Sequence, residues 1–250
     1  MSAFIPKFLL DPYDRPARLY PGLLVFLPIA VLLVCLYGTA HIIVSSVLSI
    51  LGFCGAGYAL GRVSRDAGKR IQDKLFRKWG GAPTTQLLRY RDTSIDVYTK
   101  ERFHGVLAQG LKKPLPAAEA ERADPAAADE LYRAATVWLI AQTRDTKKFP
   151  LVFKENVAFG FQRNCLGLRC YGIAMTAICI AWALFHAKVL MVTPPYFFSN
   201  PMLTLEPAEM ITLGVSAMML IAWLFLLNEG ALKRTGFSYA ERLLQSCDHL

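Results

Sequence analysis

The sequence predicts an all-α membrane protein with four transmembrane helices, two before and two after a helical cytoplasmic domain. Three observations support this class. The 250 residues are 54% hydrophobic, above the roughly 45–50% that is typical of soluble proteins. The apolar residues gather in long stretches without charge. The segments around these stretches carry nearly all of the net charge of +9.

Two apolar stretches near the N-terminus, residues 22–38 and 41–60, predict an antiparallel membrane hairpin over 22–60. Both are long enough to span a bilayer as helices. Residues 1–21 mix charges with prolines and lack the pattern of a cleaved signal peptide. We therefore expect a cytoplasmic N-terminal segment over 1–21 and a first span that is retained as an anchor.

Small residues in this hairpin predict close helix packing. Gly57 and Gly61 are four residues apart, a spacing that lets two membrane helices approach each other. The alternative is that glycine is simply frequent in membrane helices. Pro28, which lacks an N–H, is expected to kink the first span.

Residues 62–78 continue the second stretch as a basic amphipathic helix, which Gly80, Gly81 and Pro83 end. We expect its basic side chains to contact anionic headgroups or an anionic partner. The alternative is an ordinary positive flank of a span. Arg89 and Arg91 surround Tyr90 after the turn and could grip a phosphate-rich ligand. The full set is Arg62, Arg65, Lys69, Arg70, Lys74, Arg77, Lys78, Arg89 and Arg91.

Residues 61–165 are expected to form the basic helical cytoplasmic domain, because no alternating strand pattern occurs there. One helix is predicted over 99–110, and a flexible connection over 112–124. Asp124 as N-cap and Pro125 at the first helical position predict the start of a second helix. The side chains expected to be buried on that helix are Leu131, Ala135, Trp138 and Leu139.

A second transmembrane hairpin is predicted over 166–228, with spans at about 168–189 and 210–227. A membrane-entry polar cluster of Asn156, Arg163, Asn164 and Arg169 precedes and opens it. This cluster could gate a pore or dock the domain; the alternative is an interfacial helix with snorkelling side chains. Residues 229–250 are expected to form a cytoplasmic C-terminal segment, whose short helix starts at a capping box of Ser238 and Glu241.

The distribution of basic residues predicts the orientation. The segment 62–165 contains 20 Lys and Arg against 12 Asp and Glu, whereas Lys188 is the only basic residue in the two external connections. By the positive-inside rule, both termini and the central domain face the cytoplasm. The predicted location is the bacterial inner membrane, with several passes.

The sequence contains no motif that indicates catalysis. It has no HExxH, no GxxxxGK[ST] and no GxSxG pattern, and none of its six cysteines forms a CxxC pair. The four predicted spans hold no carboxylate of the kind that marks proton-coupled transporters. We expect no catalytic residue, no metal and no cofactor, and hence a protein that is not an enzyme.

Two short phrases, residues 160–168 (GFQRNCLGL) and 78–85 (KWGGAPTT), cover under a tenth of the chain. They resemble phrases in helical transmembrane proteins of bacterial anti-phage defence loci, such as small effectors of nucleotide-signalling or retron systems. The resemblance implies a toxin-like membrane protein that a cytoplasmic sensor holds silent. It carries over no functional residue.

The function that we expect is a membrane-perturbing effector, which oligomerises through small-residue faces of the second and third spans. Its basic domain would receive the signal. The expected partners are membrane lipids, further copies of the chain and a cytoplasmic regulatory protein or nucleic-acid complex. One alternative is an anchor that recruits an acidic protein or nucleic acid to the membrane. Another is a lipid-modifying enzyme that uses Glu155, Asn156 and Arg163.

Overall fold

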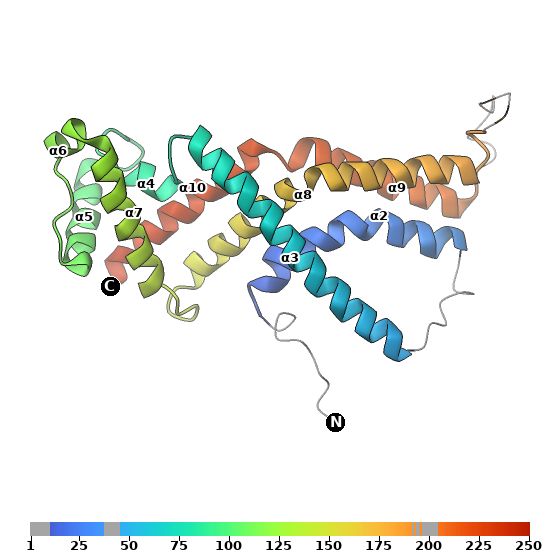
Figure 1. Ribbon diagram of the computed structural model, residues 1–250, viewed down its shortest axis with the longest axis horizontal. Coiled ribbons are helices and arrows are strands. Elements are labelled where there is room, and N and C mark those ends of the chain that lie inside the picture. Colours follow the sequence, from blue (N-terminus) through green and yellow to red (C-terminus); the bar gives the residue numbers. More distant parts are fainter. Residues whose placement is uncertain (1–10, 38–45, 192, 194–195, 197–204) are drawn as a thin grey trace. The chain divides into compact units, whose positions relative to one another are not determined.

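The computed structural model describes residues 11–37, 46–191, 193, 196 and 205–250, with the backbone alone over 46–57. The described residues form helices and no strand, which confirms the predicted all-α class for this part of the chain (Figure 1). The α-helices are α2 (Tyr20–Tyr37), α3 (Ser46–Lys78), α4 (Pro83–Leu88), α5 (Val97–Leu111), α6 (Ala118–Ala123), α7 (Pro125–Gln142), α8 (Pro150–His186), α9 (Pro207–Ile221) and α10 (Glu229–Gln245). Two π-helical turns, η1 (Arg15–Leu19) and η4 (Ala222–Leu226), and a 3₁₀ turn, η5 (Ser246–His249), complete the set.

In the described part of the chain, three helical stretches are long and apolar enough to cross a membrane: Arg15–Tyr37, Pro150–His186 and Pro207–Leu226. They overlap most of the predicted first, third and fourth spans, and they indicate a multi-pass membrane protein. The predicted second span lies partly outside the described residues, which begin again at Ser46. Its remaining part forms the start of α3.

The chain divides into two compact units. Unit 1 comprises residues 1–70 and 160–231, and unit 2 comprises residues 71–159 and 232–250. All three candidate spans contribute to unit 1. Residues 229–250 are predicted to form a separate segment, whereas α10 supplies Leu243 and Leu244 to the hydrophobic core of unit 2.

In unit 1, the C-terminal ends of α2 and α8 meet the N-terminal end of α9. The Trp182 Nε1–H on α8 donates to the Tyr37 hydroxyl on α2 at 2.9 Å. Nearby, His186 Nδ1 lies 2.8 Å from Oε1 of Glu209, whose side chain is buried. Helices α2 and α9 also run side by side (Figure 1). Helix α9 therefore returns in the direction opposite to α2 and α8.

At the other end of these helices, Arg169 on α8 reaches the π-helical turn η4. Its Nη2 donates to the Leu224 carbonyl at 2.9 Å. At about 1.5 Å of rise per residue, α8 is about 25 Å long from Arg169 to His186. The stretch between these two residues holds no charge. The length of this charge-free stretch is close to the roughly 30 Å thickness of a bilayer's hydrocarbon core.

Large apolar side chains cover the outside of this charge-free layer. Phe225, Met218 and Ile178 are 67%, 65% and 63% exposed, respectively. Such exposure is in keeping with helices long and apolar enough to cross a membrane, since hydrocarbon chains solvate apolar side chains without the cost that water imposes.

The closest helix crossing in unit 1 joins α3 to α8. A Cβ added to Gly68 would lie 2.0 Å from Oδ1 of Asn164, and one added to Gly167 would lie 2.6 Å from the Ala67 carbonyl carbon. Each glycine thus lets the other helix approach its backbone. Small residues do pack these helices, as in other membrane helix pairs.

The predicted packing pair of Gly57 and Gly61 is not this crossing. Among the described residues, a Cβ on Gly61 would meet only Arg18 Cβ, at 4.0 Å, so Gly61 makes no close approach to them. Gly57 lies among the residues whose side-chain surroundings the structure does not describe. The contact between α2 and α3 uses Gly22 instead, where a Cβ would lie 2.9 Å from Leu60 Cβ.

Unit 2 packs α4, α5, α6 and α10 around α7, which contacts α4, α5 and α6 (Figure 1). The two predicted helices are confirmed as α5 and α7, and Asp124 Oδ1 accepts from the Ala127 N–H at 3.0 Å. Ala135 and Leu139 are buried as predicted, but Tyr132 rather than Leu131 completes the buried face.

Two predictions about local structure are wrong. The connection over 112–124 contains α6, so it is not wholly irregular. Ser238 starts no helix, since α10 begins at Glu229, where Asn228 Oδ1 accepts from the Ala231 N–H at 2.9 Å.

The α3–α8 crossing predicts a specific sensitivity to volume. Gly68→Ala should destabilise the protein by about 1–3 kcal/mol, as overpacking does, because Asn164 is fully buried and has no room to move. Gly214→Ala in α9 is the matched control, since no described residue lies within 4 Å of the added methyl group. Thermal unfolding in detergent micelles measures both. Equal midpoints for the two variants would contradict the crossing.

Candidate functional site

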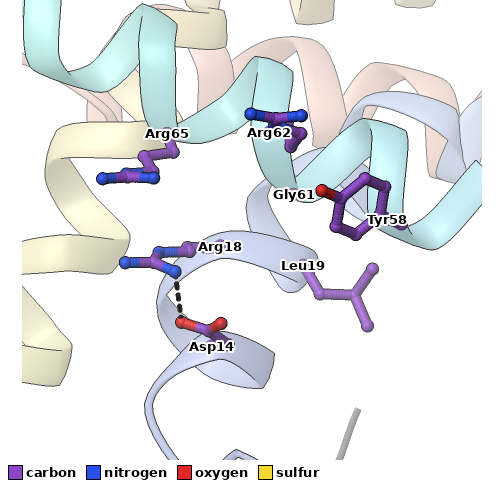
Figure 2. Close-up of a pocket in the computed structure, with 7 residues that line it drawn as sticks. All are labelled: Asp14, Arg18, Leu19, Tyr58, Gly61, Arg62 and Arg65. Atoms are coloured by element: carbon purple, nitrogen blue, oxygen red, sulfur yellow. Dashed lines mark ion pairs between the residues drawn. The ribbon is translucent and has the colours of Figure 1, made fainter. Parts of the chain in front are cut away.

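The candidate site is a basic pocket at the N-terminal end of the first candidate span, within unit 1 (Figure 2). Its volume is about 150 Å³. The residues that line it are Asp14, Arg18, Leu19, Tyr58, Gly61, Arg62 and Arg65. The chain reaches the pocket twice, first at η1 and the residue before it, and again at the middle of α3.

Helical spacing explains why these residues share one pocket. Tyr58, Gly61, Arg62 and Arg65 are three or four residues apart on α3, so they lie on one face of the helix. Figure 2 shows the α3 side chains across from η1, which carries Arg18. The apolar part of α3 ends at this level and its basic run begins.

The pocket holds three guanidinium groups and one carboxylate. Arg18 Nη1 pairs with Asp14 Oδ1 at 2.6 Å. Arg62 and Arg65 have no ion-pair partner among the residues that the structure describes. Burial raises the pKa of the Asp14 carboxyl, and the charge of Arg18 opposes that rise. When Asp14 is ionised, the pocket carries an excess of two positive charges.

Aromatic rings hold two of the arginines in place. Cζ of Arg62 lies 5.6 Å from the ring centroid of Tyr58, and Cζ of Arg18 lies 5.4 Å from that of Tyr13. Such cation–π contacts are typically worth about 0.5–1 kcal/mol at exposed sites. These contacts restrain the two guanidinium groups, whereas the Nε of Arg18 is buried and has no hydrogen-bond partner among the described residues.

Asn164 on α8 connects this region to the rest of unit 1. Its Nδ2 donates to the Ala17 carbonyl of η1 at 2.6 Å, and its Oδ1 accepts from Arg163 Nε at 3.1 Å. Pro21 has no N–H to donate to the carbonyl four residues earlier, so Asn164 supplies a donor that the helix lacks. Arg163 is also within electrostatic reach of Arg18 and adds to the positive potential.

The predicted membrane-entry cluster is only partly a cluster. Arg163 and Asn164 lie together, but Arg169 hydrogen-bonds the Leu224 carbonyl and Asn156 belongs to unit 2. The reason is helical geometry. Arg169 follows Asn164 by five residues, which turns it about 140° around α8.

The basic run of α3 is exposed along its length. All seven of its Lys and Arg residues, namely Arg62, Arg65, Lys69, Arg70, Lys74, Arg77 and Lys78, have exposed side chains, and so does Arg91. Two of them, Arg62 and Arg65, line the pocket. Contact between this run and anionic headgroups stays a prediction.

Arg89 does not belong to an exposed basic surface, and this part of the prediction is wrong. Only 8% of the residue is exposed. Its Nε and Nη2 donate to the two Asp129 carboxylate oxygens at 2.8 and 2.6 Å, and Nη2 also donates to the Gly80 carbonyl at 2.7 Å. This bidentate pair joins the turn after α3 to α7, so Arg89 stabilises unit 2.

A buried polar cluster lies beside Arg89. Oε2 of Glu121 accepts from the Tyr90 N–H and from the Tyr132 hydroxyl, both at 2.8 Å. Burial, followed by the hydrogen bond to Glu121, raises the pKa of Tyr132. Lys100 Nζ donates to the Arg89 carbonyl at 2.7 Å, and burial lowers the pKa of Lys100. These hydrogen bonds satisfy backbone groups of the segment between α4 and α5 and hold that segment in place.

Sequence reasoning found Arg62 and Arg65 but missed Arg18, Asp14 and Tyr58 as parts of the same site. Arg18 carried a usable signal, because it is the last charge before the first span.

No set of three His, Cys, Asp or Glu side chains that could hold a metal ion occurs in the described part of the chain. Comparisons with protein-family models, with curated proteins and with solved structures found no match.

Unit 2 should lose stability in mild acid because of His104. Its Nε2 lies 2.8 Å from the Leu88 carbonyl, and burial lowers its pKa from the ordinary value of 6.5. The unfolded chain therefore binds a proton before the folded protein does, and stability falls as the pH drops below about 6.5. We expect the unfolding midpoint of the full chain to fall between pH 7.5 and pH 5.5.

The matched variants are His104→Gln and His249→Gln, since His249 is exposed. The first should flatten the pH dependence over this window, and the second should preserve it. Thermal unfolding in micelles, followed by circular dichroism, gives the midpoints. A wild-type pH slope in His104→Gln would show that another group is responsible.

Proposed function

We propose that this chain is a non-enzymatic, four-span protein of the bacterial inner membrane, which perturbs the bilayer as an oligomer under control of its basic cytoplasmic part. One observation carries the proposal. The candidate spans share a charge-free layer that has arginines at one end and the His186–Glu209 pair at the other.

The two ends of this layer support the proposed orientation. Arg18, Arg62, Arg65 and Arg169 lie at the end where α2 begins and η4 finishes. A cytoplasmic position for that end satisfies the positive-inside rule. Both termini and unit 2 would then be cytoplasmic.

The position of α3 supports a fourth crossing. Leu60, near the end of the apolar part of α3, packs against Gly22, near the start of α2. The charges of Arg18 and Arg62 line the same pocket. If α2 runs from the level of the pocket toward the outside, residues 41–60 have to cross the membrane in the opposite direction to return to that level. This stretch is long enough for such a crossing.

Exposed apolar area supports association within the membrane. Only 33%, 28% and 22% of the apolar windows of the three candidate spans are buried within the chain. The remaining surface is available to lipids or to further copies of the chain. An oligomer of such helices could open a pathway through the bilayer, and an anti-phage role is the setting that the sequence resemblance implies.

A second candidate function is a membrane anchor for an acidic protein or for nucleic acid. The exposed basic residues of α3 favour it. Nucleic-acid binding should weaken steeply as salt rises, because each phosphate contact releases counterions. An effector should change membrane permeability whether or not nucleic acid is present.

Vesicle reconstitution tests the effector function. Purified protein in liposomes that contain a self-quenched dye should release the dye, and the release should rise more steeply than linearly with the protein-to-lipid ratio because several copies act together. Protein-free vesicles are the control. Intact vesicles at every ratio, also after addition of a cell extract that contains candidate activators, would count against the effector and leave the anchor.

Reporter fusions test the four-span topology. Fusions after residues 115 and 250 should be active only with a cytoplasmic reporter, because unit 2 and the C-terminus lie on the basic side. A fusion after residue 193, between α8 and α9, should be active only with a periplasmic reporter. An external position for residue 115 would overturn the orientation.

A further inference from the structure

We propose that the pocket of Arg18, Arg62 and Arg65 binds a phosphate group, and that an anionic lipid headgroup supplies it. This inference rests on the membrane placement proposed above. It does not depend on whether the protein perturbs the bilayer. It adds a defined ligand site to a basic surface whose other residues are simply exposed.

The charge of the pocket needs a counter-ion. Three guanidinium groups from two helices line one cavity, and Asp14 neutralises only the first of them. Arg163 adds repulsion toward both Arg18 and Arg65. Like charges held close together repel each other, and a bound anion reduces this repulsion.

The donors suit a phosphate group. Arginine presents planar N–H forks that match phosphate oxygens better than a lysine ammonium does. The Tyr58 and Tyr13 rings restrain two of the guanidinium groups before any ligand arrives. A volume of about 150 Å³ exceeds the roughly 30 Å³ that one water occupies, and it leaves room for a phosphate group with bound water.

The level of the pocket favours a lipid as the source. Leu19, on the pocket wall, begins the charge-free layer that continues to Tyr37. The pocket therefore opens where apolar side chains give way to arginines, which is the depth of headgroup phosphates in a bilayer. A phosphate of a lipid can reach this depth while its acyl chains stay in the hydrocarbon core.

Asp14 should oppose binding, since its carboxylate occupies Arg18 and repels an incoming phosphate. Asp14→Asn is therefore expected to tighten binding. Tighter binding of the variant would identify a specific site, because damage to the fold weakens binding and does not strengthen it. Arg65→Gln should weaken binding, and it breaks no ion pair within the described residues.

The experiment measures lipid binding to the full chain in detergent micelles by native mass spectrometry. The probes are dioleoyl phosphatidic acid, dioleoyl phosphatidylcholine and inorganic phosphate. Arg70→Gln is the matched control for Arg65→Gln, because Arg70 lies on the same helix, is exposed and does not line the pocket. Thermal unfolding without lipid checks the fold of each variant.

We expect phosphatidic acid to bind more tightly than phosphatidylcholine, whose choline masks the phosphate charge. Arg65→Gln should weaken that binding about tenfold, as loss of one charge-assisted contact does, while Arg70→Gln changes it less than about twofold on the same scale. Without lipid, Arg65→Gln should unfold at or above the wild-type temperature, because a repulsion is removed.

Equal weakening by both variants would show diffuse attraction and overturn the pocket. Equal binding of the two lipids would overturn it as well. Displacement of phosphatidic acid by equimolar inorganic phosphate would retain the phosphate site but refute the lipid source. Because no permeability is measured here, a failed leakage assay with intact lipid binding refutes only the effector, and the reverse result refutes only the pocket.

Discussion

The carboxamide of Asn164 is the contact on which the arrangement of unit 1 depends. It donates to a carbonyl of η1 and at the same time rests against Gly68 of α3. A buried amide that found no partner would cost about 1–3 kcal/mol, so the two contacts hold three segments in one position. That position brings Arg18 to the same cavity as Arg62 and Arg65. Without the glycine, α3 could not approach, and the arginines would face separate regions of solvent.

The cost of removing polar groups from water explains where charged and polar side chains lie along the helices of unit 1. The helices of unit 1 keep charge out of a layer about 25 Å deep, estimated from helical rise, and place polar side chains at both of its ends. At one end Arg169 satisfies the Leu224 carbonyl of the π-helical turn. At the other, His186 lies within hydrogen-bond distance of the buried Glu209. In hydrocarbon, each unsatisfied polar group costs several kcal/mol, so these pairs belong where the apolar layer ends.

The basic residues of the chain have two distinct physical roles. Arg89 and Lys100 are buried, and their N–H groups donate hydrogen bonds to protein oxygens within unit 2. Arg62 and Arg65 of the pocket are exposed and have no ion-pair partner among the described residues. Net charge alone does not separate these roles, because both kinds of residue contribute equally to the total of +9. Burial and hydrogen bonding separate them.

The sequence by itself determined the helical class, three of the candidate spans and the basic run of α3, because apolar runs, capping residues and glycine stops act over a few neighbouring residues. It also located Asp124 as an N-cap and Gly80 as a helix stop. It could not show that Arg89 is buried, since Asp129 is forty residues away. It could not distinguish Gly68 from Gly61 as the packing position. Only the tertiary structure decided those points and assembled the pocket, because a contact between segments distant in the chain leaves no local pattern in either segment.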